Sequence, residues 1–151
     1  MNRFLPVAGL FGLVTIAAAD KAKDAPMGDA LLMPAATLKW ADVPGFKGVK
    51  LATADGDPAK GASHFYLKFV AGFTAPLHHH SADHSGTVVS GTLVLGVDGK
   101  TSKLPPGSFF SFSHAKPHTT ACLAGADCVL AMDARDKWDV VPEAADKPTK
   151  K

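Results

Sequence analysis

Short β-prone segments, separated by turns rich in glycine and proline, make up the chain from His64 onward. In the first of these segments Phe65, Leu67 and Phe69 alternate with other residues, which places the three side chains on one face of a strand. Segments of this kind recur every 8–12 residues or so, a spacing typical of an all-β sandwich or barrel. No helical repeat competes with this pattern, so we expect an all-β fold.

The same pattern locates the individual strands and the core. We expect strands within residues 37–40, 49–54, 63–72, 87–100, 107–113 and 128–134, the fourth segment being two runs broken by Gly91. Five phenylalanines in or next to these segments are predicted to form the barrel core, some of them shaping an apolar pocket: Phe69, Phe73, Phe109, Phe110 and Phe112.

The first 19 residues have the three-part pattern of a secretory signal peptide. Arg3 supplies a positive charge, residues 4–19 carry none, and small residues precede Asp20. A membrane anchor is the alternative, but the apolar run is shorter than the roughly 20 residues that a span needs. We therefore expect a signal peptide at 1–19, a flexible segment at 20–34, one domain at 35–142 and a disordered tail at 143–151. The protein would then be periplasmic or secreted.

Charge excludes two classes of partner. The formal net charge of +2 falls to +1 when Arg3 is removed with the leader. A nearly neutral chain offers no basic surface for nucleic acid or for a membrane, so a small-molecule ligand or substrate is the expected partner.

The two cysteines, Cys122 and Cys128, enclose five residues that include Gly125. Because short apolar runs flank them, the stretch predicts a hairpin whose cysteines face each other near its mouth. An exported protein permits a disulfide there. A redox pair is the alternative, although the spacing is not Cys-x-x-Cys.

Four of the seven histidines fall between positions 78 and 84. On a strand His78 and His80 project to one face and His79 to the other. Such a His-x-His pair can grip a metal ion, and His84 follows after a short bend. His118, in another segment, is a fourth candidate from a second strand. The alternative is that each histidine is an ordinary surface or core residue.

The stretch from Gly72 to Gly91 resembles the first motif of the cupin family, which reads Gly, five residues, His-x-His, three or four residues, Glu, six residues, Gly. His78 and His80 occupy the histidine positions, and both glycines fit the spacing. The departure is His84, which stands where the family usually has Glu.

The second cupin motif is matched by spacing alone. It reads Gly, five residues, Pro-x-Gly, two residues, His, three residues, Asn, and the corresponding positions here are Gly107, Ser113, Ala115, His118 and Cys122. Only the first glycine and the histidine are kept. The short gap between the motifs is like that of small single-domain RmlC-like cupins. The resemblance implies a double-stranded β-helix, or jelly-roll barrel, with a ligand pocket inside.

The resemblance also implies a ligand set for one divalent transition metal ion: His78, His80, His84 and His118. With Glu replaced by His84 the ligands are uncharged nitrogens, which favours Cu, Fe, Zn or Ni over Mn. If His84 stays off the metal, a three-histidine site with open positions remains. Asp83 is a rival ligand if the loop shifts by one residue. His79 and His114 are expected to face away from the metal.

His64, Tyr66 and Phe69 are the candidates for lining the pocket, with surface or core roles as the alternative for the first two. The resemblance implies a metal-dependent enzyme, such as a dioxygenase acting on a small organic molecule. The missing Glu weakens an oxygenase mechanism that depends on it. The alternative is a non-catalytic cupin that binds or senses a metal or ligand. The sequence leaves open whether the chain forms a homodimer.

Overall fold

A computed structural model of the chain describes residues 30–143. The expected signal peptide at 1–19, most of the segment 20–34 and the tail beyond Glu143 lie outside these residues. The chain divides into two units, Met1–Leu32 and Met33–Lys151, and every described strand belongs to the second. Among the described residues no helix is long and apolar enough to cross a membrane.

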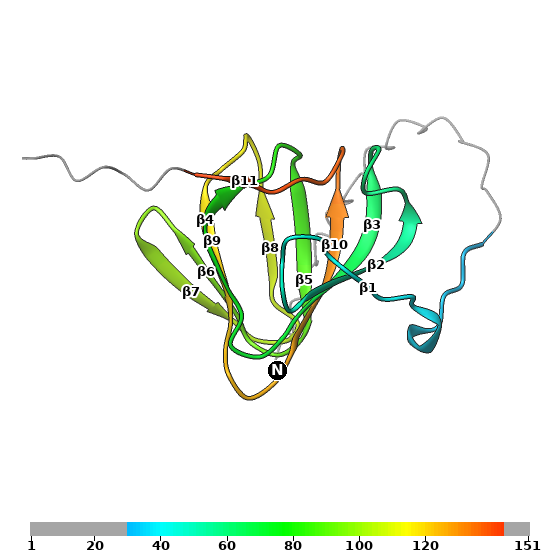
Figure 1. The fold of residues 1–151 in the computed structure, drawn as a ribbon, viewed down its shortest axis with the longest axis horizontal. Helices are drawn as coiled ribbons and strands as arrows, with labels where there is room; N and C mark the ends of the chain where they lie inside the picture. Colours follow the sequence, from blue (N-terminus) through cyan, green and yellow to red (C-terminus); the bar gives the residue numbers. More distant parts are fainter. Residues whose placement is uncertain (1–29, 144–151) are drawn as a thin grey trace, which may run out of the picture. The chain divides into compact units, whose positions relative to one another are not determined.

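Two antiparallel sheets form the second unit (Figure 1). The six-stranded sheet has the spatial order β1 (Ala41–Asp42), β2 (Val49–Gly56), β3 (Ser63–Phe69), β10 (Cys128–Ala134), β5 (His84–Ser90) and β8 (Phe109–Phe112). The five-stranded sheet has the order β11 (Val141–Pro142), β4 (Thr74–His79), β9 (His118–Cys122), β6 (Leu93–Val97) and β7 (Lys100–Leu104). The prediction of an all-β jelly roll, or double-stranded β-helix, is confirmed.

The core lies between the two sheets and follows from strand alternation. Along β3 the buried residues Phe65, Leu67 and Phe69 alternate with more exposed ones. Burying a large apolar side chain of this kind contributes roughly 1.5–3 kcal/mol. The inner faces of the other strands supply the remaining buried apolar residues: Val49, Val88, Leu93, Leu95, Cys122, Cys128, Leu130, Met132 and Ala134.

The strand predicted at residues 37–40 is wrong. A single 3-10 turn, η1 (Ala35–Thr37), occupies the start of this stretch, and the first strand begins only at Ala41. The carbonyl of Pro34 accepts hydrogen bonds from both the backbone N–H and the hydroxyl of Thr37. These local bonds give the backbone an alternative to strand pairing.

Phe109 is not a core residue, contrary to the prediction. Its side chain is 64% exposed, because it points outward from β8, which is the edge strand of its sheet. Phe110 and Phe112 are half-buried against the core, and the ring of Phe73 stacks on that of Phe69.

Cys122 and Cys128 form the expected disulfide, with Cα atoms 5.8 Å apart. The predicted hairpin, however, is wrong. The neighbours of β9 are β4 and β6, whereas those of β10 are β3 and β5. The segment between the cysteines therefore crosses from one sheet to the other, and the disulfide joins the two sheets.

Candidate metal centre

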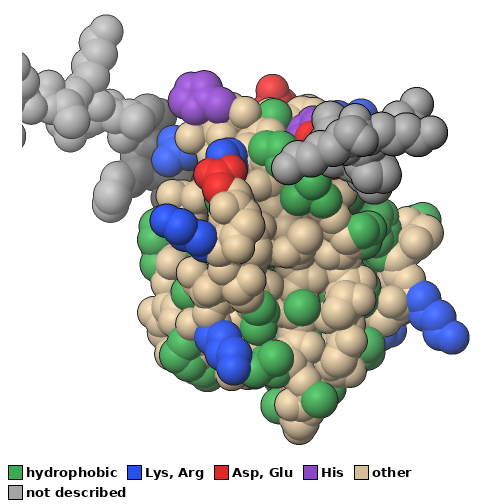
Figure 2. Space-filling view, turned by 90° about the vertical axis from the view of Figure 1, so that its left-hand side faces the viewer, with side chains coloured by type: hydrophobic (Ala, Val, Ile, Leu, Met, Phe, Trp, Pro, Cys, Tyr) green, Lys and Arg blue, Asp and Glu red, His purple; other side chains and the backbone are tan. Residues whose placement is uncertain are grey.

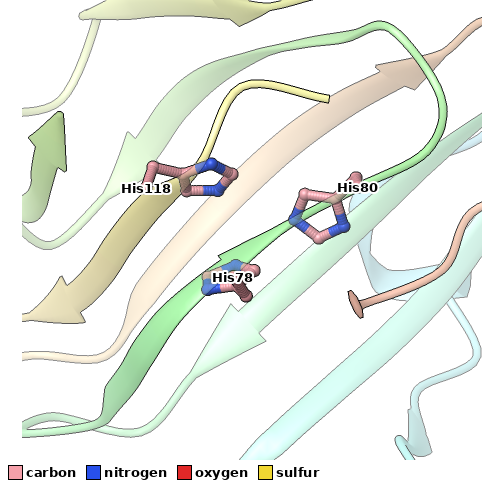
Figure 3. A group of neighbouring side chains, drawn as sticks. All are labelled: His78, His80 and His118. Carbon is pink, nitrogen blue, oxygen red and sulfur yellow. The ribbon is translucent and has the colours of Figure 1, made fainter. Parts of the chain in front are cut away.

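Three buried histidines meet where β4 and β9 lie side by side. His78 on β4 is opposite His118 at the start of β9, and His80 follows the last residue of β4. Each residue brings one ring nitrogen within 4.8 Å of the others, and Figure 3 shows the three rings turned toward a common space. All three are at most 6% exposed. Such a group of buried imidazoles could hold a transition metal ion.

Hydrogen bonds at Nδ1 decide which nitrogen can bind a metal. Nδ1 of His78 lies 2.7 Å from the carbonyl oxygen of Pro76, and Nδ1 of His118 lies 3.0 Å from that of Lys116. Nδ1 of His80 likewise bonds the backbone carbonyl of Asp139. A carbonyl oxygen can only accept, so each Nδ1 carries the proton. Nε2 is left with its lone pair, which is the arrangement of a metal-ligating histidine.

Burial keeps these rings uncharged. Removal from water lowers the pKa of His80 from its ordinary value of 6.5 to about 3, and that of His118 to about 4. Burial also lowers the pKa of His78 and of His84. The neighbouring histidines add to the effect, because a charge on one opposes a charge on the next. Neutral imidazole is the form that binds metal, so the site is ready for an ion at neutral pH.

His84 lies beside this group without belonging to it. It is the first residue of β5, in the other sheet, and is 6% exposed. Its ring centroid is 4.7 Å from that of His80 and 6.0 Å from that of His118. Its Nδ1 is 3.0 Å from the carbonyl oxygen of Ala82, so Nε2 is the unprotonated atom here too. The structure thus offers three converging nitrogens and a fourth imidazole next to them.

The other polar candidates of this region lie elsewhere. His79 points to the opposite side of β4, where its Nδ1 is 2.6 Å from Oε1 of Glu143. Asp83 is exposed, and its carboxylate accepts a hydrogen bond from the backbone N–H of His114. His114 is itself exposed. Neither Asp83 nor His114 reaches the three-histidine group.

Of the three pocket candidates on β3, only Phe69 lines the cavity. His64 and Tyr66 do not line it, because they alternate with the inward residues and face the other side of the sheet. The side chain of His64 is 61% exposed and lies 3.1 Å from a carboxylate oxygen of Asp133.

A cavity of about 70 Å³ adjoins the histidines. Among the described residues, those that line it include no acid, no lysine and no arginine. Thr120 carries the one hydroxyl. The lining residues are the four histidines with Val43, Phe46, Val49, Leu67, Phe69, Phe73, Ala75, Leu93, Leu95, Phe110, Phe112, Thr120, Leu130, Met132, Trp138 and Val140. The walls are therefore almost wholly apolar.

Two aromatic rings stack on histidines of the site. Phe112 stacks on His118 with ring centroids 4.1 Å apart, and Trp138 stacks on His80 with centroids 3.9 Å apart. Sequence reasoning missed Trp138, Val140 and Thr120 as site residues. Thr120 could have been found, since it lies two residues after His118 and shares its strand face. Trp138 stands in no recognisable strand and gave no such signal.

Comparison with known proteins agrees with this architecture. Residues 65–132 match the cupin domain family (Cupin_2). The polyketide cyclase RemF from Streptomyces resistomycificus is 19% identical and superposes with a TM-score of 0.64, covering 78% of this chain and 88% of its own. KdgF from Halomonas sp. is 23% identical with a TM-score of 0.57, covering 68% of this chain and 92% of its own.

A predicted oxalate decarboxylase from Thermotoga maritima is 15% identical with a TM-score of 0.59, covering 70% of this chain and 98% of its own. At these identities the likeness to the solved structures shows the fold alone. No curated protein matches the chain in sequence.

Proposed function

Because the chain belongs to the cupin superfamily, we propose that it binds one divalent transition metal ion through His78, His80 and His118 and a small molecule in the cavity beside it. One observation carries this proposal. Three buried imidazoles converge within 4.8 Å, and each donates its Nδ1 proton to a backbone carbonyl, which leaves Nε2 free for the ion.

The donor set supports a borderline metal. Three or four uncharged imidazole nitrogens favour Cu, Zn, Ni or Fe, whereas Mn prefers oxygen ligands such as the Glu of the family motif. His84 is the candidate for a fourth ligand beside the three that carry the proposal. Its buried ring and protonated Nδ1 match those of the other three histidines.

The cavity supports a small, largely apolar ligand. Its volume of about 70 Å³ is far below the 300–1,000 Å³ or so of pockets that enclose drug-sized molecules. Its apolar walls exclude water and hold a hydrocarbon or aromatic body by burial. Besides the histidines, the hydroxyl of Thr120 can donate a hydrogen bond to a ligand or accept one from it, and the indole N–H of Trp138 can donate one.

A metal-dependent reaction on such a molecule is the enzymatic form of the proposal. A bound ion supplies Lewis acidity toward a carbonyl or enolate oxygen, and iron or copper supplies dioxygenase-type chemistry as well. The chain contributes neutral imidazoles and a largely apolar cavity. No carboxylate lines the cavity within residues 30–143, so the histidines and Thr120 are the groups there that can hold a proton.

A non-catalytic role in binding or sensing is the second candidate, and His84 favours it. A fourth histidine on the ion closes the coordination shell, and closed shells are typical of structural sites, whereas catalytic sites keep an open position. Azide distinguishes the two forms. A shift in the visible spectrum of the cobalt-loaded protein on adding azide supports the enzyme, and an unchanged spectrum supports the binding protein.

We also propose that the protein is exported. The signal-peptide pattern at residues 1–19 and the disulfide between Cys122 and Cys128 support this proposal, because disulfides persist in oxidising compartments. Mass spectrometry of the protein recovered from the producing cells should give a mature N-terminus at Asp20. An intact N-terminus on cytoplasmic material would overturn it.

Calorimetric titration of the metal-free protein with Zn²⁺ tests the metal site. We expect one ion per chain and a more than 100-fold loss of affinity in His118→Ala. His114→Ala is the matched control, because His114 is exposed and belongs neither to the histidine group nor to the cavity lining, and it should bind as the parent does. Equal affinity in the two variants, or no binding by the parent, contradicts the proposal.

A further inference from the structure

His80 differs from the other three histidines in what holds its ring. His78, His84 and His118 each bond the carbonyl two residues earlier in the chain, so their own strand or turn fixes them. His80 instead bonds the carbonyl of Asp139, which is 59 residues away in sequence. Its orientation therefore depends on a distant part of the chain.

That part is the segment Trp138–Glu143, which we call the C-terminal clasp. It contains β11, which pairs with the end of β4 so that Val141 is opposite His79 and Pro142 opposite His78. In Figure 1 the strand β11 crosses beside β4. The backbone N–H of Glu143 also donates to the carbonyl of Leu77. The clasp thus runs along β4, the strand that carries His78 and leads into His80.

Side chains fasten the clasp at both ends. The carboxylate of Asp139 accepts hydrogen bonds from the backbone N–H of Ser81 at 2.8 Å and from its hydroxyl at 2.7 Å. At the other end Glu143 pairs with His79 at 2.6 Å. These contacts bracket His80 on both sides, so the carbonyl of Asp139 is held in place to accept its Nδ1 proton.

Trp138 covers the face of the same imidazole. Its indole stacks on His80 at 3.9 Å with 20° between the planes, and it meets the ring of His84 edge-on at 5.0 Å. Behind it, the indole packs against Phe65 of the core with centroids 5.2 Å apart. Its backbone N–H donates to the carbonyl of Pro58. The ring of His80 is thus fixed at its edge by Asp139 and on its face by Trp138.

We propose that Trp138 and Asp139 are positioning residues for His80, and that metal binding is coupled to the seating of the clasp. The proposal rests on the proposed metal site. An ion held by Nε2 of His80 favours the ring orientation that the clasp imposes. The seated clasp therefore raises the affinity for the ion, and the bound ion stabilises the seated clasp to the same extent. Partners that orient a ligating histidine typically change metal affinity 10–100-fold.

Variants of Trp138 test whether this residue positions His80 for metal binding. We expect Trp138→Ala to weaken Zn²⁺ binding by 10–100-fold in calorimetry, and Trp138→Phe, which keeps a stacking ring, to stay within about fivefold of the parent. Trp40→Ala is the control, because Trp40 contacts Lys68 and does not line the cavity. Circular dichroism identifies any variant that fails to fold. If Trp138→Ala does not fold, the affinity of Trp138→Phe and the hydrogen-exchange measurement on the parent protein decide whether the proposal holds.

Hydrogen exchange on the parent protein tests whether metal binding is coupled to the seating of the clasp. Adding one equivalent of Zn²⁺ to the folded parent should slow exchange of the backbone amides of Trp138 and Glu143 at least tenfold. Amides of β7, which lies at the opposite edge of the five-stranded sheet from β11 and lines no part of the cavity, should change less than twofold. Unchanged exchange in the clasp, or equal affinity in Trp138→Ala and the parent, overturns the inference. If the parent binds no ion, the proposed function itself has failed.

Discussion

Cys122 on β9 and Cys128 on β10 are bonded across the two sheets of the jelly roll. Replacing both with Ala should lower the free energy of unfolding by about 2 kcal/mol, because the closed loop is short. Metal affinity should stay within about threefold of the parent, since Cys122 and His118 stand at opposite ends of β9, about 13 Å apart at 3.3 Å per residue. Urea denaturation measures the change in the free energy of unfolding, and calorimetry measures the metal affinity. A large loss of metal affinity would contradict the second prediction.

Ala115 occupies the position of a glycine in the second cupin motif and has a φ of 50°. This left-handed conformation costs an L-residue with a Cβ roughly 1–2 kcal/mol, whereas glycine adopts it freely. Ala115→Gly should therefore raise the free energy of unfolding by about 0.5–1 kcal/mol.

Ala124→Gly is the control for this substitution, because Ala124 lies in an exposed turn and its φ is not positive. It should lower the free energy of unfolding by about 0.4–1 kcal/mol through the added freedom of the unfolded chain. Thermal melts of both variants test the pair, and destabilisation by Ala115→Gly would count against strain at this turn.

The metal-free protein should lose stability in acid. Burial lowers the pKa of His80 to about 3 and that of His118 to about 4, from an ordinary value of 6.5. Between pH 6.5 and these values the unfolded chain binds more protons than the folded one, so stability falls as the pH falls. The slope is roughly 1.4 kcal/mol per pH unit for each ring. Above pH 6.5 both states are neutral at these rings and the contribution is flat.

Urea midpoints of the metal-free protein at pH 7, 6 and 5 measure this slope. His80→Gln should reduce the slope by about one ring's share, roughly 1.4 kcal/mol per pH unit, and leave the share of His118 in place. A parent protein equally stable at pH 7 and pH 5 would show that the rings are not buried in neutral form.

His84→Ala should weaken Zn²⁺ binding by about 10–100-fold, less than His118→Ala does. His84 lies outside the group of three nitrogens that converge within 4.8 Å, yet its ring is buried beside them. Comparative calorimetry of the two variants tests this order. Unchanged affinity in His84→Ala would leave a three-histidine site.

Local sequence was enough to predict most strands and the pairing of His78 with His80, because alternation along a strand decides which side chains share a face. His118 was a candidate from its place in a second strand, and the spacing of the second motif supported it, although its approach to His78 is a contact between distant strands.

Features that depend on tertiary structure were not predictable. The residues between Cys122 and Cys128 suit a tight hairpin and a crossing between sheets equally well, and only the partners of β9 and β10 decide between them. Trp138 follows no strand pattern, so its stacking on His80 emerges only when the C-terminal segment lies along β4. Figure 2 shows Lys and Arg side chains at separate places on one face of the molecule, with hydrophobic side chains between them.

Anomalous diffraction from crystals of the zinc-loaded protein tests the central claim most directly. A single strong peak within bonding distance of Nε2 of His78, His80 and His118 is the predicted result. A peak elsewhere, or a metal held through Nδ1 or through carboxylates, would contradict the metal centre described by these three residues.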